Sequence, residues 1–112
     1  MTTPAPLHPW LASGRWAQLS LAEQLANIGA EVGRMRTRRT EDRARPFARA
    51  LELIDLTLAD PRWRGRRKEI ARAREILCDA ADGGHEYGST LEALDRYFLA
   101  FAVLARRQRP SP

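Results

Sequence analysis

The sequence has few residues that carry redox or metal chemistry. Cys78 is the only cysteine, so a disulfide within the chain is excluded. It lies in a short apolar run, where a thiol usually packs as a small hydrophobic side chain. His8 and His85 are far apart in the sequence, and together with one cysteine they are too few for a zinc site. We therefore expect no bound metal and no cofactor.

Long apolar runs and catalytic motifs are missing as well. No stretch approaches the ~20 apolar residues that a membrane-spanning helix needs. Residues 1–10 contain three prolines and no basic segment, unlike a secretory signal, so we expect a cytoplasmic protein without a membrane partner. There is no glycine-rich phosphate loop and no nucleophile motif. His85 beside Glu86 is expected to be exposed or locally hydrogen-bonded, so we do not expect an enzyme.

Positive charge is abundant and almost entirely arginine. The formal net charge is +5, and Lys68 is the only lysine. Arginine has a planar guanidinium group that pairs with phosphate through two hydrogen bonds and stacks on bases. A basic, arginine-rich chain therefore suits a nucleic-acid backbone or an acidic protein. A GC-rich coding sequence combined with an ordinary solvated surface is the alternative explanation.

Apolar residues recur at helical spacings in four segments of the chain. These segments are residues 21–38, 46–59, 66–81 and 91–107. Ser20 with Glu23, and Ser89 with Glu92, match the capping box that opens a helix. Thr40 is an alternative start for the second segment. No segment alternates apolar and polar residues as a half-buried strand does.

These features predict an all-α protein built as an up-down-up-down four-helix bundle. The bundle would span residues 19–108, after an irregular arm over residues 1–18 and before a tail over residues 109–112. Tyr97 and Leu104 are expected to widen the buried face of the fourth helix. Three helices that pack on a partner chain are the main alternative to a closed bundle.

Small residues line one side of the first predicted helix, beside its core stripe. They are Ala22, Ala26, Gly29 and Gly33. Each glycine costs roughly 1 kcal/mol of helix propensity, and close packing of another helix is the expected compensation. Trp10 and Trp16 in the arm are too apolar to leave in water without a reason. We assign all six residues to oligomer or partner contacts.

The basic residues fall into three clusters, within residues 34–45, 62–74 and 106–109. In an up-down bundle, the second and third clusters lie at the same pole and should merge into one patch. Trp63 lies within it and could stack on a base. The predicted nucleic-acid contacts are Arg62, Trp63, Arg64, Arg66, Arg67, Lys68, Arg106 and Arg107. A solvated turn whose arginines favour a helix C-terminus is the alternative.

Several stretches of the chain have the character of a known family. Residues 19–33, 50–61 and 74–79, with the shorter pieces 68–70 and 97–98, resemble small bacterial helical proteins encoded beside the reverse transcriptases of diversity-generating retroelements. The resemblance covers about residues 16–107. It implies an accessory variability determinant, which is a four-helix bundle that assembles into a basic ring, binds the reverse transcriptase and contacts template RNA.

The charge pattern and the resemblance together lead to one main functional hypothesis. We expect a non-enzymatic, homo-oligomeric accessory subunit that binds nucleic acid, RNA before DNA, and a partner enzyme such as a reverse transcriptase. A protein-only oligomeric adaptor, whose basic face meets an acidic partner protein, is the alternative.

Overall fold

The part of the chain that the structure describes, residues 14–108 of a computed structural model, is built from helices. The long helices are α1 (Leu21–Thr37), α2 (Ala44–Ala59), α3 (Arg67–Ala81) and α4 (Leu91–Gln108). Short 3-10 helices precede three of them: η2 (Trp16–Gln18), η3 (Thr40–Asp42) and η4 (Pro61–Arg66). No strand occurs within residues 14–108, so the prediction of an all-α protein with four helices is confirmed there. None of these helices is long and apolar enough to cross a membrane.

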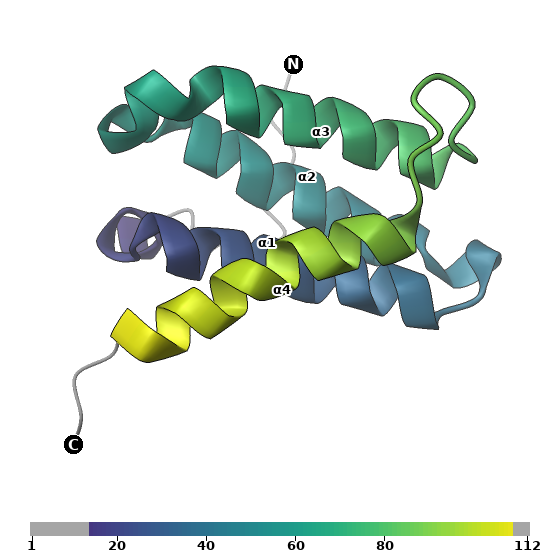
Figure 1. Cartoon of the computed structure of the whole chain (residues 1–112), viewed down its shortest axis with the longest axis horizontal. Helices are drawn as coiled ribbons and strands as arrows, with labels where there is room; N and C mark the ends of the chain where they lie inside the picture. Colours follow the sequence, from purple (N-terminus) through teal and green to yellow (C-terminus); the bar gives the residue numbers. More distant parts are fainter. Residues whose placement is uncertain (1–13, 109–112) are drawn as a thin grey trace, which may run out of the picture.

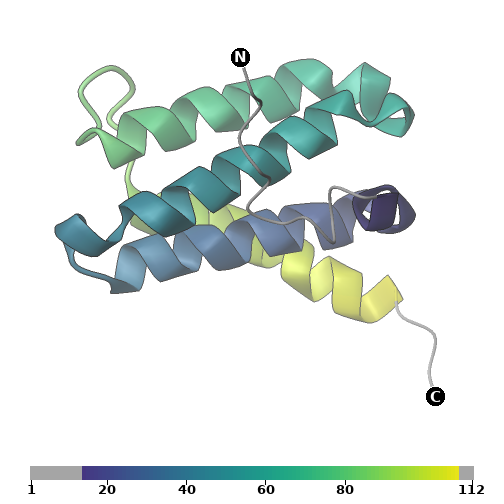
Figure 2. The same cartoon turned by 180° about the vertical axis from the view of Figure 1, so that it is seen from behind.

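The four helices do not pack equally closely. α1 makes its most extensive contact with α4 and the next with α2, whereas α3 contacts α2 and only sparingly α4. Figures 1 and 2 show that α4 starts beside the end of α3, crosses α1 obliquely and diverges from α3 toward the C-terminus. The side of α4 that faces α3 near its start is therefore left without a neighbour farther along.

Local sequence accounts for the start of α1. Ser20 accepts a hydrogen bond from the backbone amide of Glu23 at 3.1 Å, and the Glu23 carboxylate accepts one from the Ser20 amide at 3.0 Å. This is the predicted capping box, and it satisfies two amides that the first turn leaves without partners. Thr40 opens the separate η3, and Pro46 lies in the first turn of α2, where proline is tolerated.

The connection between α3 and α4 is organised by Asp79. Its carboxylate accepts hydrogen bonds from the backbone amides of Glu86, Tyr87 and Ser89 at 2.8, 3.1 and 3.3 Å. The pKa of Asp79 is lowered, first by the Glu86 amide, because amide donors favour the charged carboxylate. The second predicted capping box is wrong, since Thr90 rather than Ser89 accepts the bond from Ala93, at 3.1 Å.

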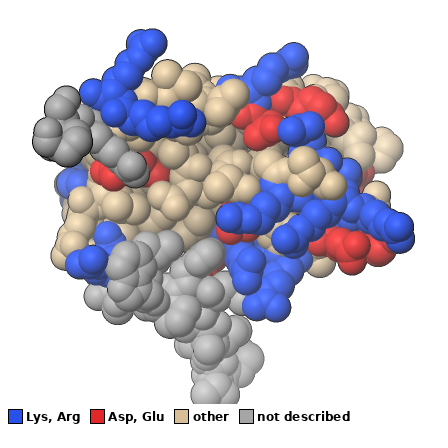
Figure 3. All heavy atoms as spheres, turned by 90° about the horizontal axis from the view of Figure 1, so that it is seen from below, with Lys and Arg blue, Asp and Glu red and all other residues tan. Residues whose placement is uncertain are grey.

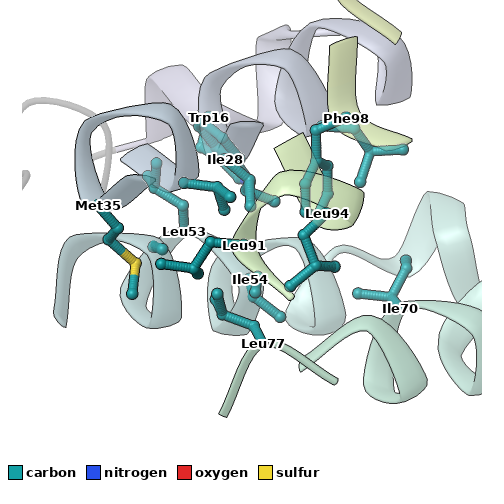
Figure 4. Close-up of a cluster of buried hydrophobic side chains, with 13 residues drawn as sticks. Trp16, Ile28, Met35, Leu53, Ile54, Ile70, Leu77, Leu91, Leu94 and Phe98 are labelled. Atoms are coloured by element: carbon teal, nitrogen blue, oxygen red, sulfur yellow. The ribbon is translucent and has the colours of Figure 1, made fainter. Parts of the chain in front are cut away.

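The core lies where the inner faces of all four helices meet (Figure 4). Its fully buried members include Ile28 and Val32 from α1, Leu53 and Ile54 from α2, and Leu77 from α3. These residues belong to the apolar stripes that the sequence analysis identified, so the helical periodicity located the core correctly. Burial of such side chains contributes roughly 1.5–3 kcal/mol each.

The small residues of α1 face α4 of the same chain. A Cβ atom added at Gly29 would clash with the Cβ atom of Phe98, and one at Gly33 would lie 3.4 Å from the Asp95 carboxylate. Ala22 and Gly29 are buried, and Ala26 is partly buried. The assignment of this stripe to a subunit interface is therefore corrected, because α4 occupies the close approach that the small residues provide.

Of the two tryptophans in the predicted arm, only Trp16 lies within the described residues. Trp16 lies in η2 and is buried, with its indole nitrogen donating to the Thr57 hydroxyl at 3.0 Å. Trp16 is therefore a core residue rather than a partner contact. Trp10 lies outside the described residues, as does the predicted tail over residues 109–112.

The outer side of α4 differs from its prediction. Tyr97 and Leu104, which were expected to widen the buried face, are 39% and 42% exposed. The physical reason is the divergence of α4 from α3 (Figure 1). Tyr97 keeps only an edge contact with α3, where its hydroxyl donates to Glu69 Oε1 at 3.4 Å, and Leu104 lies farther along the diverging helix.

Candidate nucleic-acid interface

The turn between α2 and α3 carries most of the predicted contacts, and buried Asp60 fixes its conformation. Pro61 disfavours a helical conformation at the residue before it, so Asp60 leaves α2 in an extended conformation. Its carboxylate then accepts a hydrogen bond from the Arg62 amide at 3.0 Å, which caps η4. The sequence Asp60-Pro61 therefore both ends α2 and starts η4.

Arg62 uses its guanidinium group within the chain. Its Nη2 donates to Asp60 Oδ2 at 2.7 Å and to the carbonyl oxygen of Leu19 at 2.7 Å, and its Nε donates to Asp60 Oδ1 at 3.1 Å. Donation from Arg62 is the largest influence that lowers the pKa of Asp60 from 3.8 to about 2. The predicted phosphate contact of Arg62 is thus weakened, because its charge and two of its donor groups already serve Asp60 and Leu19.

Gln24 connects this turn to the start of α1. Its Nε2 donates to the Trp16 carbonyl at 2.8 Å and to Asp60 Oδ2 at 3.2 Å. Its Oε1 accepts from the indole nitrogen of Trp63 at 2.9 Å. Gln24 is fully buried, and its bonds to Trp16 and Asp60 are buried with it, whereas the bond from Trp63 is partly buried. We call Gln24, Asp60, Arg62 and Trp63 the polar hub.

Trp63 is held in the hub from two sides. The indole nitrogen donates to Gln24, and the Arg62 guanidinium carbon lies 4.4 Å from the ring centroid. The side chain is also half-buried, against the hydrophobic core. Trp63 therefore positions Arg62 through a cation–π contact and is poorly placed to stack on a base.

Arg67 is likewise engaged with the backbone. Its Nε donates to the carbonyl oxygen of Leu58 at 3.2 Å, near the C-terminal end of α2. The negative end of the α2 helix dipole stabilises a guanidinium group at this position. Its side chain is exposed, so it could still contribute charge, but its orientation is set by α2.

Three cations on this turn remain available to an external anion. Arg64 and Lys68 are exposed and have no hydrogen-bond or ion-pair partner within residues 14–108. Arg66 approaches Glu69 at 3.9 Å, but both side chains are more than half exposed, and such a pair contributes little. The three lie at the N-terminal end of α3, where the helix dipole disfavours positive charge and attracts an anion. The polar hub holds this turn in place, so we call Arg64, Arg66 and Lys68 the turn cations.

Arg106 and Arg107 lie at the same end of the molecule as the turn cations, but on its opposite edge. Figures 1 and 2 show η4 and the last turn of α4 separated by the start of α1. Both arginines are exposed. The expected single patch is therefore divided into two groups of positive charge, which a short ligand would not contact together.

The first basic cluster lies at the other end, where α1 stops and α2 begins. Figure 3 shows basic and acidic side chains together at that end, and an uncharged surface in the middle of the same face. Arg34 pairs with Glu31 at 2.7 Å, and Arg36 pairs with Asp95 at 2.7 Å. Part of this cluster is therefore neutralised.

Comparisons with known proteins found no relative of this chain. No protein-family description, curated protein or solved structure matches this chain.

Two functional elements of the turn were missed by the sequence analysis. Nothing in the sequence indicated the role of Gln24, because its hydrogen-bond partners Asp60 and Trp63 come close to α1 only when η4 folds against it. The second helical segment was predicted to end at residue 59, just before Asp60, but the Asp60 carboxylate was not recognised as the partner of Arg62. The only indication of this pair in the sequence is that Asp60 directly precedes Pro61 and lies two residues before Arg62.

Proposed function

We propose that this protein is a non-enzymatic accessory subunit that binds RNA through the turn cations. The observation that carries the proposal is the contrast within one turn: Arg62 and Arg67 are engaged by the chain, whereas Arg64, Arg66 and Lys68 face solvent without a strong partner. The polar hub fixes the backbone of this turn, so binding of a phosphate backbone need order only the side chains of the turn cations.

The wider role that we propose is an oligomeric up-down-up-down bundle that brings RNA to a partner enzyme. The partner would be the reverse transcriptase of a diversity-generating retroelement, and the resemblance of residues 16–107 to accessory variability determinants supports this. Arg106 and Arg107 would form a second contact for a longer RNA.

Fluorescence anisotropy of labelled single-stranded RNA, measured over a range of salt concentrations, tests the proposal. We expect affinity to fall steeply as salt rises, because phosphate binding releases counterions. Reversing the turn cations with Arg64→Glu, Arg66→Glu and Lys68→Glu should weaken binding and reduce the slope of log affinity against log salt by about 2.

The matched control reverses three exposed cations at the other end, with Arg38→Glu, Arg39→Glu and Arg45→Glu. Both variants change the net charge equally, so non-specific attraction falls equally in both. A turn variant that binds no worse than this control would rule out the turn cations as the site. RNA affinity that does not depend on salt would rule out phosphate binding altogether.

A protein-only adaptor is the second candidate, and the exposed apolar face of α4 favours it. Tyr97, Leu99, Val103 and Leu104 are each at least 39% exposed, which suits contact with protein rather than with phosphate. A purified chain that shifts no labelled RNA at low salt, but binds an acidic protein, would decide for the adaptor.

A further inference from the structure

The second half of α4 is apolar on every side up to its last turn, which carries Arg106 and Arg107. Residues 97–105 contain no charged residue. Phe98 and Ala105 face the core, while Ala93, Tyr97, Ala100 and Leu104 follow a second stripe at spacings of 4, 3 and 4. All four residues of this outer stripe are exposed. A helix that is apolar all round is normally covered, and a stripe at this spacing matches the seam between paired helices.

The outer stripe continues into a groove between α3 and α4. This groove has a volume of about 510 Å³, and its walls include Ala73 and Ile76 from α3. Ala93 and Tyr97 belong both to the groove and to the outer stripe. Glu69 and Arg72 of α3 also line the groove. The apolar surface therefore extends from α3 across α4 and is bordered by charged side chains of α3.

The charges at the two ends of the outer stripe are opposite in sign. Glu92 lies at its start, and Arg106 and Arg107 lie just beyond its end. All three are exposed, and none has an ion-pair partner within residues 14–108. Two parallel copies of α4 would place like charges together at both ends. Two antiparallel copies would place Glu92 of each beside the arginines of the other.

One antiparallel register also matches large side chains to small ones. It places Tyr97 opposite Ala100 of the second copy and Leu104 opposite Ala93 of the second copy. In the same register, Glu92 lies within one residue of Arg106 of the second copy. Arg96 flanks the stripe, and its long side chain can cover apolar surface while the guanidinium group stays in water. Steric fit and charge thus select the same alignment.

We propose that the outer stripe of α4 pairs in antiparallel orientation with α4 of a second copy, which gives a two-fold symmetric dimer. In such a dimer the same surface patch serves both subunits, and this requires the self-complementary pattern described above. The proposal rests on the homo-oligomer part of the proposed function and on none of its RNA-binding part.

Sedimentation equilibrium of the full chain, free of nucleic acid and over a range of concentrations, tests this pairing. We expect a mass of twice 12.7 kDa at high concentration. Leu104→Glu should weaken the dimer by at least about 100-fold, because each subunit would bury a charge against Ala93 of the second copy. Ala48→Glu is the matched control on the exposed side of α2 and should leave the dimer unchanged. Circular dichroism checks that both variants keep their helices.

A charge exchange tests the antiparallel register specifically. Glu92→Arg alone and Arg106→Glu alone should each weaken the dimer by about 10-fold, since each places like charges together. The double variant should recover most of the original affinity. A mass of one chain at every concentration, or a Leu104→Glu variant that dimerises normally, would overturn the proposal. A double variant no better than its parents would overturn the register.

RNA binding by the Leu104→Glu variant separates the two proposals. A monomer that still binds RNA with steep salt dependence leaves the RNA site intact. Loss of RNA binding in the turn variant with an unchanged dimer mass leaves the α4 pairing intact.

Discussion

The turn between α2 and α3 and the loop between α3 and α4 lie at opposite ends of the molecule, and each is organised by one buried aspartate (Figure 1). Asp60 is paired mainly with side chains, those of Arg62 and Gln24. Asp79 is paired with the backbone amides of Glu86, Tyr87 and Ser89. Both arrangements lower the pKa of the carboxyl group, but through different donors.

The difference matters because the partly exposed Arg62 guanidinium group can turn toward water when its acceptor is removed, whereas backbone amides in a short loop cannot. Asp79 therefore contributes mainly to the loop's conformation. Asp60 binds Arg62, whereas Arg64 and Lys68 have no partner within residues 14–108 and Arg66 has only the weak pair with Glu69. Asp79 thus stabilises the conformation of the loop between α3 and α4, whereas Asp60 holds one positive charge of the turn between α2 and α3 within the chain.

Replacing each aspartate by alanine gives the largest expected effects. Asp60→Ala should lower the free energy of unfolding by about 1–3 kcal/mol, since Arg62 can re-solvate. Asp79→Ala should lower it more, because several backbone amides lose their acceptor at once. Urea denaturation at neutral pH measures both. Exposed Asp82 supplies the control, and Asp82→Ala should fall within about 0.5 kcal/mol of the parent. Equal losses from the two aspartates would contradict the distinction.

The next largest effect is expected from acid, which should remove the stability contributed by the pair of Asp60 and Arg62. The pKa of Asp60 is lowered from 3.8 to about 2, so its contribution is fully present above pH 4 and is lost as the pH falls toward 2. The parent should be more stable than Asp60→Asn by about 2 kcal/mol at neutral pH, and this difference should shrink across that window. Urea denaturation of the two proteins at several pH values measures it. A difference that stays constant down to pH 2 would show that the charge of Asp60 does not stabilise the turn.

The smallest expected effect comes from Trp63. Trp63→Phe keeps an aromatic ring beneath Arg62 but removes the donor to Gln24 Oε1, which should cost about 1 kcal/mol. Thermal unfolding followed by circular dichroism measures the change. RNA affinity should remain near that of the parent, because Trp63 acts within the polar hub. A loss of RNA affinity larger than the loss of stability would instead make Trp63 a direct contact.

Most of the fold followed from local patterns in the sequence. The apolar spacings gave four helices, and Ser20 with Glu23 gave the start of α1 correctly. The exposure of Tyr97 and Leu104 could not be predicted in this way. Periodicity shows that these positions lie on an apolar side of α4, but the angle at which α4 leaves α3 depends on packing between distant segments.

The candidate site was predictable in charge but not in geometry. Clustering in the sequence located the basic turn, yet it could not separate Arg62 from Arg64, because the difference depends on contacts with Asp60 and with the Leu19 carbonyl. The glycines of α1 were correctly identified as a place of close helix approach. Whether that helix came from the same chain or from another subunit depended on the tertiary fold.

The contact between Gly29 and Phe98 also sets how closely α4 lies on α1. The backbone of α1 at this point leaves no space for even one methyl group. Any residue larger than glycine at position 29 would therefore push Phe98, and α4 with it, away from α1.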